Sequence, residues 1–197
     1  EDENIYIADK HSGVSCEALC SELCSRGEFY AVHRLHRNTE GLTVFAKNRA
    51  AEEELLSAFK NRSVKKRYLA LCKNNFKRPN AVLEAYSEKD GQASEVKIYG
   101  TPRRGAVKII TEYKILENRG ELALVEVTLH TGRTHQIRAH MSHIGCPVLG
   151  DGKYGDGLLN KKYNAGRQRL LAKYLQFEFD GALDYLNGRI FESKKEL

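Results

Sequence analysis

The sequence predicts an α+β fold built on a mixed, largely antiparallel sheet, and three observations lead to this. Strand-like stretches rich in Tyr, Val and Ile follow one another through the middle of the chain. Few segments carry helical signals, and they do not alternate with the strands as βαβ units would. The 197 residues are 41% hydrophobic and 29% charged, and no Pro/Ser-rich linker or repeat divides them. We therefore expect one domain over residues 1–197, with helices flanking the sheet.

The first elements are a strand and a cysteine-rich helix. The apolar run Ile5–Ile7 predicts the strand, and Gly13 marks the turn that follows it. Cys16, Cys20 and Cys24 are spaced four residues apart, so they share one face of a short helix. The chain has five cysteines, an odd number, and neither a disulfide framework nor the Cys-x-x-Cys spacing of a zinc site is indicated. A buried face of small residues is the favoured interpretation.

A second strand and helix follow. Residues 41–47 (GLTVFAK) are expected to form a strand, and Asn48 is a suitable N-cap for the helix after it. Leu55, Leu56 and Phe59 form the apolar stripe of that helix.

The remaining chain is mostly strand. Strands are expected at residues 67–73, 81–87, 93–99, 107–116 and 122–130. Thr134 is expected to cap a helix whose apolar stripe is Ile137, Met141 and Ile144, and a late strand is expected at residues 170–179.

The charge is a weak indicator of function. The chain carries 32 Lys and Arg against 26 Asp and Glu, a net charge of +6, and the basic residues gather in five clusters. Such clusters can bind a phosphate backbone, but charge alone is equally compatible with an ordinary surface that keeps a protein dissolved. No apolar run is long enough to span a membrane and no signal peptide opens the sequence, so we expect a cytoplasmic protein that does not bind membranes.

Four histidines, His130, His135, His140 and His143, lie close together in the sequence. They lack the His-Glu-x-x-His spacing that places two ligands and a base on one helix face. Histidines that are solvated or hydrogen-bonded explain the group, and we expect no metal.

Three segments together carry a resemblance to a known family. They are HRLHRNTEGL at residues 33–42, KRYLA at 66–70, and TGRTHQIR at 131–138 with its continuation through Gly150-Asp151 and Tyr154-Gly155. In this order they resemble the RluA family of RNA pseudouridine synthases, and the resemblance spans nearly the whole chain. It implies a domain with a central active-site cleft, and it implies conversion of uridine to pseudouridine in structured RNA, ribosomal or transfer RNA.

The resemblance also implies roles for individual residues. The reaction breaks the N1–C1′ bond, rotates the uracil and joins C5 to C1′, and it needs no cofactor. Tyr68 would support the detached base, Ile137 would form an apolar wall that excludes water, and Arg133 would pair with the catalytic acid. The residues expected to contact RNA are Arg34, Arg37, Lys66, Arg67, His135, Gln136 and Arg138.

One departure falls at the centre of this pattern. His36 occupies the position of the family's catalytic Asp, and Glu40 stands where the family has Ser. An imidazole is a base near neutral pH but carries no negative charge, so Glu40 is a candidate for a compensating carboxylate beside Arg133. Three functions therefore compete: an active synthase with an altered site, an RNA-binding relative without turnover, and a metal-dependent hydrolase using His33, His36 and the later histidines. The sequence indicates no oligomeric state.

Overall fold

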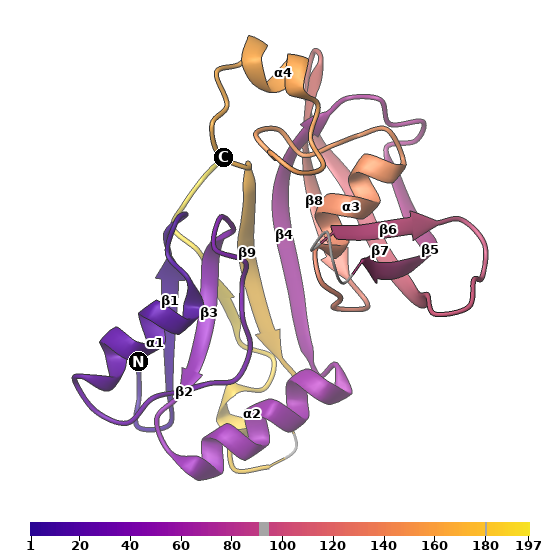
Figure 1. Ribbon diagram of the computed structural model, residues 1–197. Helices are drawn as coiled ribbons and strands as arrows, with labels where there is room; N and C mark the ends of the chain where they lie inside the picture. The colour runs from indigo at the N-terminus through magenta and orange to yellow at the C-terminus, as the bar shows by residue number, and fades with distance from the viewer. Residues whose placement is uncertain (91–94, 180) are drawn as a thin grey trace. The chain divides into compact units, whose positions relative to one another are not determined.

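The computed structural model describes residues 1–90, 95–179 and 181–197. Contacts between α-carbons divide the chain into two compact units, residues 1–66 with 171–196 and residues 67–170 with 197, and each is described by itself (Figure 1). The prediction of one domain over residues 1–197 stays a prediction. None of the helices in the described ranges is long and apolar enough to cross a membrane.

The bounds of the elements follow the chain. The first unit holds β1 (Ile5–Lys10), α1 (Cys16–Cys24), β2 (Tyr30–Ala31), β3 (Glu40–Ala46), α2 (Arg49–Asn61), most of β9 (Leu170–Phe177), the 3-10 helix η1 (Asp184–Leu186) and β10 (Ile190–Glu192). The second unit holds most of β4 (Val64–Lys73), and β5 (Asn80–Asp90), β6 (Glu95–Tyr99), β7 (Val107–Arg119), β8 (Leu122–Leu129), α3 (Gln136–His143) and α4 (Gly157–Lys162).

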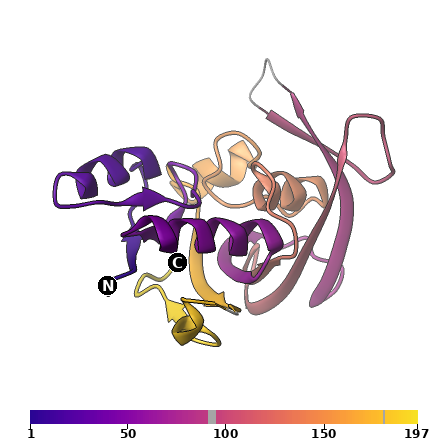
Figure 2. The ribbon, with the colours of Figure 1, turned by 90° about the horizontal axis from the view of Figure 1, so that it is seen from below.

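In the first unit, β3 is the central strand. It pairs antiparallel with β1 and β2 and parallel with β9, and β10 adds antiparallel to β9. Because side chains alternate along a strand, Val44 joins a core that includes Leu55 of α2, while Phe45 joins Leu23 of α1 in a separate cluster. The two helices therefore cover opposite faces of β3. Figure 2 shows α2 along its whole length.

Local signals explain where these helices begin and end. The Asn48 side chain accepts a hydrogen bond from the Ala51 N–H, as an N-cap should, so the predicted start of α2 is confirmed. The helix ends at Arg62, whose backbone is left-handed with φ 64°. The predicted apolar stripe is wrong at Leu56, which is 44% exposed, whereas Leu55 is fully buried.

A glycine permits the parallel pairing of β3 with β9. Gly41 has φ +108°, and a Cβ atom there would lie 2.3 Å from the carbonyl oxygen of Ala172. Any other residue would push the two strands apart. Gly41 thus fixes the start of the strand that follows the 33–39 segment.

The second unit is built on an antiparallel sheet with the strand order β4-β8-β7-β5-β6. Ile109, Tyr113, Val125 and Val127 are buried along it. Helix α3 packs against β6 and β7 (Figure 1). With helices flanking a mostly antiparallel sheet, the predicted α+β class is confirmed.

Several sequence predictions need correction. Thr134 does not cap α3: the N-cap position is His135, with φ 52° and no side-chain hydrogen bond to the helix. Helix α4 was not expected, although Asp156 caps it by accepting from two backbone amides. The late strand ends at Phe177 rather than at residue 179. Two residues of the predicted strand 93–99, residues 93 and 94, lie outside the described residues.

The cysteine helix forms as predicted, with Ser15 as its N-cap. The five cysteines are free thiols. Cys16 is buried, Cys20 is partly buried and Cys24 is exposed, so the expected buried face holds only for the first turn.

Candidate active site

The segment from Val32 to Thr39 forms the first half of the candidate site. It has no regular secondary structure, and His33 anchors one end of it. The His33 Nε2 atom accepts a hydrogen bond from the Val44 N–H at 2.9 Å, and the ring stacks on Phe59 with centroids 4.3 Å apart. Burial lowers the pKa of His33 to about 3, and the cation of Lys66 adds to the effect. The ring stays neutral and can accept this bond, so His33 acts structurally.

His36 follows in the same segment and is half-buried. Its carbonyl oxygen accepts a hydrogen bond from the Thr39 N–H at 2.9 Å, which closes a turn. On the next residue, the Arg37 carbonyl accepts from the Gly13 N–H at 2.9 Å, and the Arg37 Nε–H donates to the Gly13 carbonyl at 2.7 Å. The backbone around the imidazole is therefore closely held.

Lys10 lies beneath this segment. Its side chain is almost fully buried, and its ammonium donates to the carbonyls of His11, Val14 and Arg37 at 3.1, 2.9 and 3.1 Å. Burial lowers the pKa of Lys10, and the negative charge of Glu40 opposes that shift. Within this unit the Glu40 carboxylate therefore acts on Lys10.

The basic residues Arg34 and Lys66 of the first unit differ in their exposure and contacts. The Arg34 side chain is 71% exposed, with Glu17 at 3.8 Å as a loose ion-pair partner. The Lys66 ammonium lies over the ring of Phe59, 5.4 Å from its centroid, and burial lowers its pKa. Arg34 is thus the better placed of the two to bind a phosphate in solution.

In the second unit, Gln136 shapes the loop that carries Arg133. Its Oε1 atom accepts from the Thr131 hydroxyl at 2.9 Å and from the Arg133 N–H at 3.0 Å. Its Nε2 group donates to the Ile110 carbonyl at 3.1 Å and to the Thr111 hydroxyl at 3.0 Å. With its amide fully used and only 2% exposed, Gln136 has a structural role.

The guanidinium of Arg133 is presented by this loop. Arg133 is exposed, and among the described residues of its own unit no carboxylate lies within 4 Å of it. Ile137, the second residue of α3, is only 4% exposed. An exposed cation and a buried apolar residue thus lie four residues apart in the chain.

Arg138 and His135 are also held inside the unit. The Arg138 guanidinium donates two hydrogen bonds to the Asp151 carboxylate, at 2.7 and 2.8 Å, and the Asp151 side chain is fully buried. His135 Nδ1 lies 2.9 Å from the hydroxyl of Tyr154, which also accepts from the Val96 N–H at 2.8 Å. Gln136 and Arg138 thus make hydrogen bonds within this unit, and their contact with RNA stays a prediction.

Asp151 and Tyr154 were not expected as site residues, although they belong to the third resembling segment. Burial alone would raise the pKa of Asp151, but the hydrogen bonds and charge of Arg138 outweigh it and hold that pKa below its ordinary value. An acidic residue after a Gly in an otherwise apolar stretch was the signal available in the sequence.

Tyr68 and Arg67 lie next to each other on β4. Tyr68 stands opposite Val127 and is 8% exposed, and burial raises the pKa of its hydroxyl to about 12. The phenol is therefore neutral at physiological pH. The Arg67 guanidinium forms an ion pair with Glu126 at 3.0 Å, so part of its charge is already balanced.

Metal binding was tested by looking for clusters of donor side chains. Within residues 1–90, 95–179 and 181–197, no group of three His, Cys, Asp or Glu could hold a metal ion. The hydrolase alternative has no metal site in that part of the chain.

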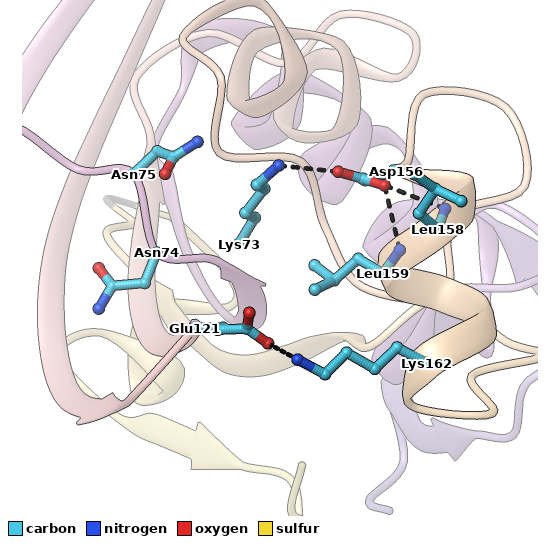
Figure 3. A pocket seen from close by; sticks show the side chains of 8 residues that line it. All are labelled: Lys73, Asn74, Asn75, Glu121, Asp156, Leu158, Leu159 and Lys162. Carbon is cyan, nitrogen blue, oxygen red and sulfur yellow. Dashed lines mark hydrogen bonds and ion pairs between the residues drawn. The ribbon is translucent and has the colours of Figure 1, made fainter.

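A pocket of about 390 Å³ opens in the second unit (Figure 3). Its charged side chains pair with one another: Lys73 bonds to Asp156 at 2.8 Å, and Lys162 bonds to Glu121. It contains none of the residues expected in the active site, and its balanced charges give no attraction for RNA.

Residues 5–143 match the family model described as RNA pseudouridylate synthase. The chain is 39% identical over 132 residues to ribosomal large subunit pseudouridine synthase D of Borreliella burgdorferi, a match that covers 66% of this chain and 40% of that protein. It is 34% identical over 192 residues to the RNA pseudouridine synthase YjbO of Bacillus subtilis, covering 90% of this chain and 65% of that protein.

A solved structure has the same fold throughout. Human RNA pseudouridylate synthase domain containing 1 superposes with a TM-score of 0.80 at 26% identity, covering all of this chain and 89% of that one. The architecture is thus that of an RNA pseudouridylate synthase domain. The chain belongs to the RNA pseudouridylate synthase family. It spans about half the length of the curated relatives it matches.

Proposed function

We propose that this chain is the catalytic domain of an RNA pseudouridine synthase that isomerises uridine in structured RNA, ribosomal or transfer RNA. The observation that carries the proposal is the family match over residues 5–143 together with a fold likeness that covers the whole chain. Relatives named as ribosomal large subunit synthases favour ribosomal RNA as the substrate.

The residues of the second unit suit the binding of a detached base. The neutral Tyr68 ring supplies an aromatic platform and a hydroxyl that can move a proton at C5. Ile137 supplies an apolar wall. Arg133 supplies a cation toward the negative charge that develops when the N1–C1′ bond breaks.

His36 supplies the base in this proposal. A neutral imidazole removes the proton from C2′ as the N1–C1′ bond breaks, and the electron pair of that bond leaves with N1 of the uracil. After the uracil rotates, C5 bonds to C1′, the imidazolium returns a proton to C2′, C5 loses its proton and N1 gains one. Atoms and electrons balance without a cofactor. This route avoids a covalent bond from residue 36 to the sugar, which an imidazole would form less readily than a carboxylate.

A second candidate is an RNA-binding relative without turnover. It is favoured by one observation: residue 36 is a histidine, which carries no negative charge, at the position where the resembling family has its catalytic Asp. In this candidate the base pocket and the RNA contacts persist, and Glu40 is the compensating carboxylate predicted from the sequence.

Turnover and binding measured on the same samples separate the two candidates. RNA labelled with tritium at C5 of uridine releases tritium only when C5 bonds to C1′. The first candidate predicts tritium release by the wild type and its loss in His36→Ala, with RNA binding retained in both. The second predicts salt-sensitive RNA binding and no release. Glu40→Ala serves as the matched variant, and loss of wild-type release in Glu40→Ala with retention in His36→Ala would assign the base to Glu40.

A further inference from the structure

The segment between β1 and α1 runs alongside the segment that carries His36. The Ser12 hydroxyl donates to the Asn38 carbonyl at 3.3 Å, and Gly13 exchanges two hydrogen bonds with Arg37. Gly13 has φ +87°, a conformation that favours glycine and turns the chain at this point. The residue after His36 is therefore fixed from this side.

The residue before His36 is fixed by a thiol. The Cys16 sulfur accepts a hydrogen bond from the Leu35 N–H at 3.2 Å and donates one to the Leu35 carbonyl at 3.5 Å. These separations are ordinary for sulfur, which is larger than oxygen. Cys16 is 2% exposed and Leu35 is 7% exposed, so neither backbone group of Leu35 has water as a ready alternative.

We propose that Cys16 is a positioning residue for His36. This rests on the proposed function, in which His36 is the base. A segment without helix or strand has few hydrogen bonds of its own, and Leu35 and Arg37 bracket the imidazole on both sides. Loss of the thiol leaves the Leu35 N–H and carbonyl buried without a partner, and the segment relaxes toward solvent. A base displaced by a fraction of an ångström from the C2′ proton works more slowly.

The same helix offers matched controls. Cys20 and Cys24 both donate to the carbonyl of Phe29, at 3.7 and 3.3 Å, and not to the 32–39 segment. Cys20→Ala therefore removes a thiol hydrogen bond from α1 without touching the backbone beside His36. Cys16→Ser keeps a donor and an acceptor with a shorter reach, whereas Cys16→Ala keeps neither.

Amide hydrogen exchange tests the contact itself. In Cys16→Ala, the Leu35 amide should exchange about five to ten times faster than in the wild type, since one net hydrogen bond corresponds to about that factor. Cys16→Ser should recover part of the protection, and Cys20→Ala should leave Leu35 unchanged. An unchanged Leu35 rate in Cys16→Ala would overturn the proposal.

The rate of tritium release and the NMR resonance of the His36 ring test whether Cys16 positions His36. In Cys16→Ala, kcat for tritium release should fall about tenfold while KM for RNA stays within twofold, and the His36 ring resonance should shift in NMR spectra. Cys16→Ser should recover part of kcat. An unmoved His36 resonance, or a kcat equal to that of the wild type, would overturn the proposal. If neither the wild type nor His36→Asp releases tritium, the proposed function fails, and the ring resonance and Leu35 exchange still decide whether Cys16 positions residue 36.

Discussion

The side-chain carbonyl of Gln136 accepts a hydrogen bond from the backbone N–H of Arg133 at 3.0 Å. His135, the N-cap residue of α3, has a left-handed backbone with φ 52°, so the Arg133 loop does not continue the helix. Since the same Gln136 amide also bonds to three residues of the sheet and loop, the conformation of the Arg133 loop depends on one buried side chain.

We predict that Gln136→Leu lowers the free energy of unfolding by about 3 kcal/mol, because it leaves several buried polar groups without partners. Gln136→Glu keeps the acceptor atoms and loses the donors, so its loss should be comparable. Urea unfolding monitored by circular dichroism measures both. A loss below about 0.5 kcal/mol in Gln136→Leu would mean that the amide does not organise this loop.

The buried ion pair of Arg138 with Asp151 provides a second prediction. Removing one partner leaves an uncompensated charge in a site from which water is excluded, so Asp151→Asn and Arg138→Ala should each cost about 3–5 kcal/mol of stability. The exposed pair of Arg119 with Glu117 is the control, and Glu117→Gln should have far less effect on stability because solvent screens that pair. Equally small losses of stability from both pairs would contradict the view that the Arg138–Asp151 pair is a buried, stabilising ion pair.

The third prediction concerns acid stability and His140. Burial lowers the pKa of this histidine to about 4, with the neighbouring His143 adding to the effect, and Nδ1 of His140 lies 2.9 Å from the Thr111 hydroxyl. The unfolded chain, with a histidine pKa near 6.5, binds the proton more readily than the folded one. The stability that the neutral His140 contributes is therefore fully present above about pH 6.5, and it is lost as the pH falls toward 4.

Between pH 7 and pH 5 this difference amounts to about 2 kcal/mol. His140→Gln should remove that part of the pH dependence, whereas His143→Gln, at an exposed position, should leave most of it, because burial is the larger cause of the shift. Unfolding free energies from urea titrations at the two pH values provide the comparison. An unaltered slope in His140→Gln would show that His140 does not titrate in this way.

A fourth prediction separates the two roles of Tyr68. Tyr68→Phe keeps an aromatic ring and loses the hydroxyl, so RNA affinity should stay within about twofold while tritium release falls about 100-fold. Because burial raises the pKa of this hydroxyl to about 12, activity should show no loss from Tyr68 ionisation up to about pH 10. Full activity of Tyr68→Phe would exclude a proton-transfer role and leave only the platform.

Periodicity predicted most of the fold. Alternation located most of the strands, with β2 and β10 missed, and Asn48 located the start of α2. The errors have physical causes. Leu56 lies at the edge of its helix stripe, where tertiary packing and not spacing decides burial. A left-handed N-cap at His135 has no counterpart in the usual Ser, Thr, Asp or Asn signal, so Thr134 seemed the better cap.

The roles of the predicted site residues stay predictions, but the structure adds internal contacts that the sequence did not show. The family resemblance named Gln136 and Arg138 as residues that contact RNA. A sequence alone does not show which polar side chains form hydrogen bonds inside the fold. The Arg138 guanidinium pairs with the Asp151 carboxylate, and the Gln136 side-chain carbonyl accepts from the Arg133 N–H. The sequence also did not show the hydrogen bonds of Cys16 with the Leu35 backbone beside His36. These two residues are 19 positions apart in the chain and meet only in the fold.

Tritium release from C5-labelled uridine RNA, by the wild type and by His36→Asp, tests the central claim most directly. If His36 stands where a carboxylate would act, wild-type release should be slow but measurable. The Asp variant, which restores the carboxylate of the family pattern at residue 36, should then release tritium about 100 times faster. No release by either protein, at RNA concentrations where both are saturated, would contradict the account.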